Sequence, residues 1–557
     1  MDQLLARLRT IAEGQKAELR ILTGLSDEVS IATARYANRL EIPLHLISLE
    51  QPRTLADQKA ERVVWLGTGD PKNEDALAIR NDVALAFSDM LVLLWDGQAP
   101  HEHSQEAVRL AMHAALGMEP ILWLVPDGSV RMLDRSRLDT PYRHKLRAPH
   151  PRYEWLLDLF TEPLDEMTYS RILSETFSLI LDPSPIVSDL GENVRVEDYR
   201  SQPSPIRSGR AGHLHEAMMS LVRGDWTRFV KQFSSRLPQP YWGPAKADSL
   251  PSAPRIEACF ERFDVSASVA AGRHRDASWI IYWTSAMAVL AAVAGAIGLW
   301  PGGHNAFWSV AEVLLIAIII TVVVYAKRCR WHEIWIGHRF LAEQLRYARV
   351  CLPLLGVSRP FLEPAWRAEK GRLYLENTEL WYLQRTLVAE GFPVGSDGVA
   401  YVPCNDASVV RMAEYLRTVV EDQHAYHHRN HHKLHLVHER IAHFSNGLFI
   451  ATILAVLGHF VLHAEWLLIC TAFFPALAAA LHGLATKLEI TRIAGQSAAM
   501  ERELGDLAAA IAEAGNYHDW EGWVRLRQLA LEASRVMSDE NGQWQQLIRH
   551  QETELPA

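Results

Sequence analysis

Trp279–Trp300 reads WIIYWTSAMAVLAAVAGAIGLW, a long apolar run without a single charged side chain. Three further runs of this kind follow at Ala306–Ala326, Gly447–His463 and Trp466–Ala485. Each approaches the about 20 residues that a helix needs to cross ~30 Å of hydrocarbon. Because the runs form two closely spaced pairs, the sequence predicts two transmembrane hairpins and a function exercised at a membrane.

Basic residues flank the hairpins on one side only. They are Arg273, Arg275, Lys327, Arg328, Arg330, Lys433, Arg440, Lys487 and Arg492. The hairpin loops, Pro301–Asn305 and His463–Glu465, contain no Lys or Arg. The positive-inside rule then predicts a multi-pass protein with both termini in the cytoplasm. The charged N-terminal residues lack the apolar segment of a signal peptide, which agrees with this topology.

The overall composition narrows the classes of partner and cofactor. A net charge of −10 argues against general nucleic-acid binding, which favours basic domains. The five cysteines are scattered and include no CxxC pair, so neither a disulfide framework nor a cysteine zinc site is indicated. We therefore expect no metal and no cofactor, and a lipid bilayer as one partner.

Residues 1–180 are typical of an α/β domain. Short apolar runs suited to buried strands occur at Leu19–Thr23, Leu44–Leu49, Val63–Leu66, Met90–Trp95 and Ile121–Val125. Helical patterns such as Ser26–Leu40 and Ser104–Gly117 separate several of them. Strands alternating with helices predict a doubly wound, Rossmann-like parallel sheet, which binds ligands outside the carboxyl ends of its strands.

The rest of the chain divides into four parts. Residues 181–255 are rich in Pro, Ser and Arg and predict a linker with a helical insert at His213–Leu237. Residues 256–375 form a first two-span unit, 376–423 a cytosolic connector, and 424–557 a second two-span unit with C-terminal helices. The same order of helix, span, turn, span and long helix occurs twice, which predicts a parallel repeat in an otherwise all-α region.

Three segments of the N-terminal region carry a resemblance. RILTGLSDEVSIATARYA (Arg20–Ala37), FSDMLVLLWDGQ (Phe87–Gln98) and PILWLVPDG (Pro120–Gly128) resemble the SLOG family of Rossmann-like domains. That family includes DNA-processing and phosphoribohydrolase relatives. The resemblance implies a domain that senses a nucleotide or a nucleotide-derived signal.

The membrane region has a resemblance of its own. RWHEIWIGHRFLAEQLRYARVCLPLLG (Arg330–Gly356), LENTELWYLQRTLVAEG (Leu375–Gly391) and ENGQWQQLIRHQETELP (Glu540–Pro556) resemble the SLATT family of two-span effector units. Together the two resemblances imply a bacterial anti-phage conflict protein of the inner membrane. They imply that the membrane part forms a pore or channel that disrupts the membrane when the sensor binds its ligand.

The first candidate ligand loop is Thr23-Gly24-Leu25-Ser26-Asp27, at an expected strand-to-helix junction. A glycine lets the backbone approach a ligand, and the helix start offers free N–H groups. Asp27 suits a ribose hydroxyl better than a phosphate, because its carboxylate and a phosphate would both be negatively charged and would repel each other. Ser26 is equally well explained as a plain N-cap.

The second candidate loop is Asp96-Gly97, which ends another strand at the same expected sheet edge. Asp96 would accept a hydrogen bond from a ribose or a base, and the alternative is a simple turn. Where the SLOG family commonly has a Gly-Gly-Thr phosphate element, this chain has Pro100–Glu106, so that Ser104 and Glu106 are the remaining candidates there. This departure favours sensing over catalysis and an assignment as a non-enzyme.

Histidines form the most unusual local composition. His424, His428, His431, His435 and His438 step by 4, 3, 4 and 3 residues and share one face of a helix. We refer to these five residues as the histidine stripe. Three interpretations compete: a stalk that packs on a neighbouring helix, a pH-sensitive gate, and a metal site.

Few polar or helix-bending residues interrupt the apolar runs. The candidates for pore or gating roles are Glu312, His459, Pro475 and His482. Ionisable residues in membrane helices usually face a bundle interior or a water path. The alternative is an interfacial position for Glu312 and hydrogen bonding within the bundle for the histidines.

Three functions are compatible with these features. The first is a ligand-gated membrane effector that acts as a homo-oligomer, because four helices are too few for a wide pore. The second is a membrane-anchored, phosphoribohydrolase-like enzyme acting on nucleotides, with Glu106 as the nearest acid/base candidate. The third is a membrane scaffold with a degenerate sensor domain.

Overall fold

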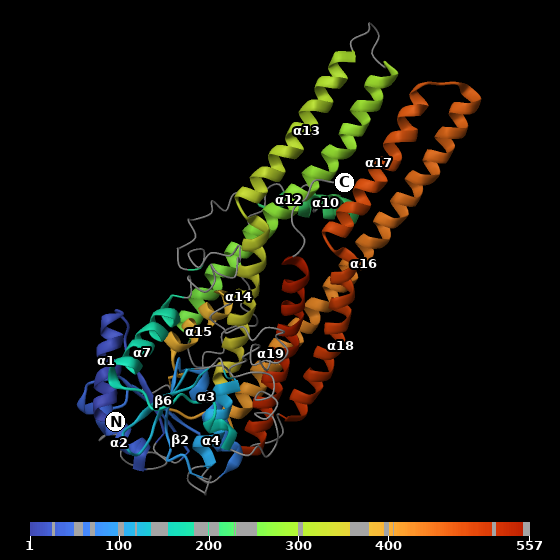
Figure 1. Cartoon of the computed structure of the whole chain (residues 1–557). Coiled ribbons are helices and arrows are strands. Elements are labelled where there is room, and N and C mark those ends of the chain that lie inside the picture. The colour runs from blue at the N-terminus through green and yellow to red at the C-terminus, as the bar shows by residue number, and fades with distance from the viewer. Residues whose placement is uncertain are drawn as a thin grey trace.

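The structure is a computed structural model of the 557-residue chain. Figure 1 shows small sheets with helices at one end, two long apolar hairpins at the other, and extended helices that join them. The described residues are 1–24, 28–49, 59–66, 73–98, 105–116, 120–134, 137, 154–182, 199, 211–227, 229, 253–298, 305–356, 378–394, 400–404, 406–514 and 520–549.

The long helices occur as two sets of three with the same order, followed by a last helix. Their bounds are α12 (Pro254–Ile297), α13 (Asn305–Arg328) and α14 (Trp331–Cys351), then α16 (Asp406–Leu462), α17 (Trp466–Lys487), α18 (Ile490–Ala514) and α19 (Trp520–Arg549). Arg330 and Glu489 have positive φ angles of 49° and 51°. Each lies where the second helix of a set ends, so both sets break at an equivalent place.

The five strands that the sequence predicted in the N-terminal region are present as β1 to β5, and the first three of them form one parallel sheet. β1 (Ile21–Thr23), β2 (Leu44–Ser48) and β3 (Arg62–Trp65) are neighbours in that order. His45 lies opposite Arg62 in the ladder. Parallel pairing places the carboxyl ends of these strands at one edge.

A second sheet contains the next strands of the chain. β4 (Leu91–Leu94) and β5 (Ile121–Leu124) are parallel, and β6 (Val130–Met132) pairs with β5 in the antiparallel direction. The Asp127 carboxylate accepts the N–H of Ser129 at 2.8 Å and tightens the turn between them. The turn sends the chain straight back, which makes β6 antiparallel to β5. The sequence predicted one doubly wound parallel sheet, whereas the described strands form two short sheets.

Helices of the N-terminal region pack on both faces of the sheets. They are α1 (Asp2–Gly14), α2 (Glu28–Arg39), α3 (Glu74–Ala86), α4 (Gln105–Leu116), α6 (Glu154–Leu157) and α7 (Glu166–Leu181). α1, α2 and α7 pack on Leu44, Leu46 and Val63 of the first sheet. Leu122 and Val130 of the second sheet join the same cluster, so the two sheets share a core on this side.

The opposite face of the first sheet is covered by α3 and by the long helices. Because successive side chains of a strand point to opposite faces, Ile47 and Val64 point away from α1 and α2. Both are buried in a larger cluster that contains Leu341 of α14 and Trp523 of α19. Apolar burial contributes roughly 25 cal/mol per Å², so this shared core binds the α/β region firmly to the helices.

The connector between the two helix sets is part of the same assembly. α15 (Thr378–Glu390) packs on α3, and the Arg385 guanidinium pairs with the Asp89 carboxylate at 2.5 Å. β7 (Ala400–Tyr401) then adds a fourth parallel strand to the first sheet, beside β3. The sequence did not predict this strand.

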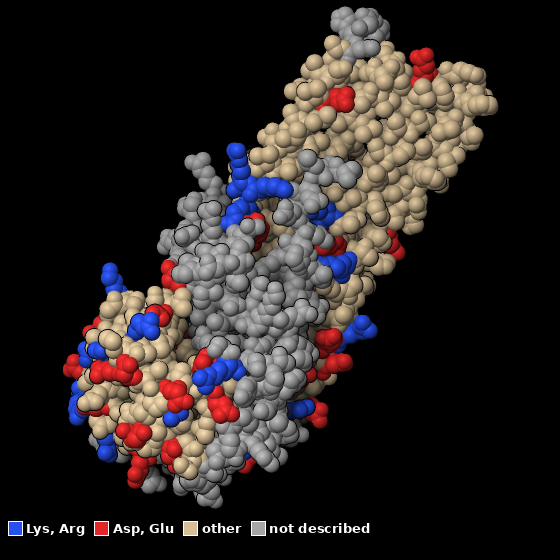
Figure 2. Space-filling model, in the orientation of Figure 1, with Lys and Arg blue, Asp and Glu red and all other residues tan. Residues whose placement is uncertain are grey.

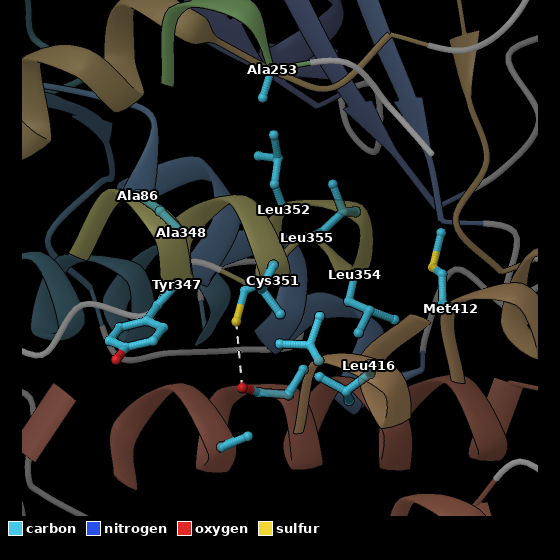
Figure 3. Packing of buried hydrophobic residues seen from close by; sticks show 14 of the residues in the cluster. Ala86, Ala253, Tyr347, Ala348, Cys351, Leu352, Leu354, Leu355, Met412 and Leu416 are labelled. Carbon is cyan, nitrogen blue, oxygen red and sulfur yellow. Dashed lines mark hydrogen bonds between the residues drawn. The ribbon is translucent and has the colours of Figure 1, made fainter. Parts of the chain in front are cut away.

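Figure 3 shows the buried apolar core where α14 ends. Tyr347, Ala348 and Cys351 from α14 belong to one apolar cluster with Leu416 of α16, and a short turn at Leu352–Leu354 follows the helix. The Cys351 thiol donates to a backbone carbonyl of α19 at 3.4 Å. Cys351 therefore behaves as a buried apolar residue.

Four helices, α12, α13, α16 and α17, include windows that are long and apolar enough to cross a membrane. They lie in a row, since α12 contacts both α13 and α17, and α17 contacts α16. The outer helices expose large apolar side chains, with Leu314 of α13 at 59 % and Phe460 of α16 at 79 %. Figure 2 shows Lys and Arg side chains below the hairpins and none on their visible face. Such a surface suits contact with lipid.

Candidate functional site

The first candidate ligand loop begins at the end of β1. Thr23 is the last residue of that strand, and it and Gly24 are half-buried. Ser26 and Asp27 lie outside the described residues. α2 begins at Glu28, so the loop joins a strand end to a helix start, as predicted.

The second candidate loop, after β4, is a tight turn. The Asp96 carboxylate accepts the N–H of Gln98 at 3.0 Å, and the Trp95 indole donates to the Gln98 carbonyl at 3.2 Å. Gly97 has φ +76°, and a Cβ there would lie 3.3 Å from the Trp123 ring. Gly97 is therefore needed by the turn itself, and Asp96 is exposed with one oxygen engaged within its own loop.

The structure says little about the last two predicted site residues, Ser104 and Glu106. Ser104 lies outside the described residues, and Glu106 is placed only as a backbone position in the first turn of α4. β1 and β4 belong to different sheets, although Ile21 and Val92 pack on one shared cluster. The structure thus places Thr23 at the end of β1, Gly24 directly after it, and Asp96 just beyond β4 in the other sheet.

Glu390, at the end of α15, caps the start of α12. Its carboxylate accepts the backbone N–H groups of Arg255 at 2.8 Å and Ile256 at 2.9 Å, and the side chain is almost fully buried. The first amides of a helix have no partner within the helix, and an anion is favourable there. The end of α15 is therefore fixed to the helix that carries the first apolar run.

Arg62 of β3, in the α/β region, binds the backbone at the end of α15. Its guanidinium donates to the backbone carbonyls of Glu390 at 2.6 Å and Phe392 at 2.5 Å. Arg20, just before β1, donates to the Val388 carbonyl at 3.2 Å. Polar contacts therefore run without a break from the first sheet, through the end of α15, to the start of α12. We call Arg62, Glu390 and the first turn of α12 the junction.

A buried charge cluster joins three of the long helices. Glu343 of α14 is 2 % exposed and pairs with Arg346 at 2.6 Å and with Arg339. Arg339 also pairs with Asp264 of α12 at 2.9 Å, and Arg346 donates to Gln423 of α16 at 3.4 Å. Burial opposes ionisation of Glu343, but the two guanidiniums outweigh it and hold the pKa of its carboxyl below the ordinary value.

The histidine stripe faces α18. The ring of His428 contacts the Glu501 carboxylate at 2.7 Å, and the ring of His431 contacts the Ala494 carbonyl at 3.0 Å. His438 contacts a threonine of α18 at 3.1 Å, and His424 lies beside Gly505 of that helix. His435 instead approaches Glu439 on its own helix, at 3.7 Å. These contacts agree with the interpretation of the stripe as a stalk that packs on a neighbouring helix. Among the described residues, no group of three or more side chains is placed so that it could hold a metal ion.

The polar residues of the apolar helices lie on different helices. Glu312 is half-buried on α13, at one end of the row, and His459 is half-buried on α16, at the other end. The His459 ring contacts the Ala464 carbonyl at 3.0 Å, within its own hairpin. Pro475 and His482 are exposed on α17. One chain therefore does not bring these four residues together.

The sequence interpretation missed the charged side chains that join the long helices to one another and to the α/β region. Arg339, Glu343 and Arg346 are spaced at i, i+4 and i+7 in α14, a pattern that places them on one face and was available as a signal. Nothing local marks Glu390 or Arg62, whose roles depend on contacts between segments that are distant in the chain.

No protein-family model matches the chain, and neither curated proteins nor solved structures include a significant match.

Several buried histidines outside the apolar runs are held neutral, among them His45 and His338. Burial, together with the charges of Arg20 and Arg62, lowers the pKa of His45 from 6.5 to about 3. Burial also lowers the pKa of His338 to about 3, with nearby arginines adding to the effect. The His338 ring contacts the hydroxyl of Ser266 at 2.8 Å and so links α14 to α12.

These histidines predict a loss of stability in acid. The unfolded chain takes up protons at both rings below their ordinary pKa of 6.5, whereas the folded chain does so only near 3. Folding therefore weakens as the pH falls through that window and is unaffected by these groups above it. We expect the thermal unfolding midpoint of detergent-solubilised protein to drop between about pH 7 and about pH 5.

The matched variants make this test specific. His45→Gln combined with His338→Gln should weaken the dependence on pH without removing it, because burial also lowers the pKa of His215. Replacement of the exposed His443 by Gln should leave the dependence intact. An unchanged slope in the double variant would show that other groups cause the effect.

Proposed function

We propose that the chain is a membrane effector whose α/β region senses a nucleotide-derived ligand and controls a leak formed by the transmembrane hairpins. The observation that carries the proposal is the junction, which links the first sheet to the start of α12. The shared core between that sheet and the long helices supports it further. The likeness to SLOG and SLATT segments suggests an anti-phage role in a bacterial inner membrane, with both termini cytoplasmic.

The proposed ligand site lies at the carboxyl ends of β1 and β4. In a doubly wound arrangement these two strands would be neighbours, and their following loops would form the usual ligand crevice. Thr23 and Gly24 would approach the ligand with backbone groups, and Asp96 would accept from a ribose or base with its remaining oxygen. Ser26, Asp27, Ser104 and Glu106 complete the proposed set.

The proposed pore needs several copies of the chain. A row of four helices encloses no channel, so copies would have to join through the exposed faces of α13 and α16. In such an oligomer Glu312 and His459 could approach residues of a neighbouring copy, while Pro475 offers a bend in α17. The ligand would shift the equilibrium between the closed and open forms because it binds one of them with higher affinity.

The test uses the full chain reconstituted in dye-loaded liposomes. We expect dye release on addition of one nucleotide from a panel, or of extract from phage-infected cells, and loss of that response in Asp96→Ala. The control is Asp165→Ala, because Asp165 also accepts a backbone N–H, from Thr168 at 2.8 Å, but does so at the start of α7. The proposal fails if no addition releases dye, or if both variants respond alike.

One observation favours a second function, a membrane scaffold with a degenerate sensor. The Asp96 carboxylate is already engaged by Gln98 in its own turn, as it would be in a loop that binds nothing. A scaffold would show wild-type behaviour after Asp96→Ala and no thermal shift of the full chain with any nucleotide. A binding ligand would instead raise the unfolding midpoint by mass action.

A further inference from the structure

A short helix lies where the two apolar hairpins meet the cytosolic helices. This helix, α10 (His213–Val222), begins against α12. The Asp276 carboxylate accepts the N–H of Gly212 at 2.7 Å and that of His215 at 2.8 Å. The Trp279 indole donates to the His215 ring at 3.1 Å. Since Trp279 is the first residue of the first apolar run, α10 begins at the boundary of the apolar layer.

The other end of α10 lies at the same level on α16. The Arg440 guanidinium donates to the Val222 carbonyl at 3.1 Å. Arg440 precedes Gly447, where the third apolar run begins, by about two helical turns. Figure 1 shows α10 beside α12 and close to the second hairpin. The helix therefore bridges the two hairpins along the cytosolic boundary of their apolar surface.

The inner side of α10 is packed between the hairpins. Met219 is 3 % exposed and belongs to a cluster with Trp279 of α12, and Val437 and Ile441 of α16. At the start of α10, a Cβ on Gly272 would lie 2.7 Å from the Gly212 nitrogen, so the backbones touch there. These contacts fix the orientation of α10 and its position along the axes of α12 and α16.

The turn after α10 leaves a large aromatic side chain uncovered. Trp226 is 65 % exposed, and its ring meets that of Phe229 edge to face at 6.0 Å. Such exposure is unfavourable in water, whereas indole rings concentrate at the boundary between lipid and water. Tyr325, 57 % exposed near the cytosolic end of α13, marks the same boundary on the first hairpin.

The charges at this level complement lipid headgroups. Arg440 is exposed beside the end of α10, and Arg328 is exposed at the end of α13. Arginine side chains at a membrane surface pair with the phosphates of phospholipids, while the neighbouring aromatic ring enters the layer below. Aromatic and cationic groups thus occur together at one height.

We propose that the segment from α10 to Trp226 is an interfacial anchor that lies in the headgroup layer of the cytosolic leaflet, with Trp226 inserted among phospholipid headgroups. The proposal rests on the four apolar helices crossing a membrane. Its partner is the phosphate and upper acyl region of phospholipids. A second copy of the chain packing on Trp226 is the competing occupant.

The test measures depth in vesicles made of phosphatidylcholine and phosphatidylglycerol. A Trp226→Cys chain is labelled with an environment-sensitive fluorophore, and nitroxide lipids carry the quencher near the headgroup or deep in the acyl layer. We expect quenching mainly by the shallow nitroxide. A label quenched by neither nitroxide, whether exposed to water or shielded by a second copy, overturns the anchor.

Two matched positions separate this outcome from a failure of membrane insertion. Met167→Cys, 80 % exposed on α7, should be quenched by neither lipid, and Leu454→Cys, 63 % exposed on α16, should be quenched by the deep one. If Leu454→Cys is also unquenched, the transmembrane assignment itself is wrong. Thr227→Cys serves if Trp226→Cys does not fold, and the unsubstituted chain gives the background from its five cysteines.

Discussion

Glu343→Gln should destabilise the folded chain by about 3 kcal/mol, near the lower end of the usual cost of removing one partner from a buried ion pair. Glu343 is 2 % exposed, and its carboxylate neutralises Arg346, whose side chain is 15 % exposed. Without it, that guanidinium stays buried with no counter-charge. Arg339 moderates the loss because its side chain is 37 % exposed and it retains its ion pair with Asp264. Denaturant unfolding in detergent, followed by circular dichroism, measures the change.

The control for this prediction is Glu421→Gln. Glu421 pairs with Arg417 at 3.6 Å on the surface of α16, with both side chains about half exposed. Exposed pairs of this spacing contribute ~0.3–0.5 kcal/mol, so the control should hardly change stability. Equal effects of the two substitutions would contradict the view that the cluster joins α12, α14 and α16.

Glu390→Ala should abolish ligand-triggered leakage while the protein still inserts into membranes. The substitution removes the carboxylate that holds the first amides of α12, at 2.8 and 2.9 Å. Hydrogen bonds to charged groups contribute about 1.5–3 kcal/mol each, so the loss of two should also lower the unfolding free energy by about 3–6 kcal/mol. Dye release from liposomes and flotation with vesicles measure leakage and insertion.

Two variants separate signalling from stability at this position. Glu390→Gln keeps one acceptor oxygen and should restore part of the response, whereas Glu414→Gln, on the exposed side of α16, should behave as wild type. Full leakage in Glu390→Ala would show that the signal reaches α12 by another route.

The elements that were predicted well are those with a strong local pattern. The apolar runs near Trp279 and Trp466 are long enough to identify helices from composition alone. Buried parallel strands such as β2 are also locally distinct, because both faces are apolar. β6 was missed although Pro126-Asp127-Gly128 is a strong turn signal that favours a hairpin.

The candidate site was predicted less completely. The sequence placed Thr23 at the end of a strand and Asp96 directly after one, as in the structure, but it did not show that Asp96 would be engaged by Gln98. It also treated residues 376–423 as a connector, although β7 pairs with β3 there. A two-residue strand has too few side chains to produce a periodic pattern, so only its partner reveals it.

The sequence by itself determined that this chain has four helices apolar enough to span a membrane, in two sets of equal order, and an α/β region before them. These properties follow from the length of each apolar segment and the spacing of its apolar residues, which are local features of the sequence. Only the tertiary structure decided that Glu390 caps α12 and that Arg62 holds the same segment. Such contacts depend on geometry between distant segments, and a carboxylate or guanidinium has no preferred partner until folding brings one within reach.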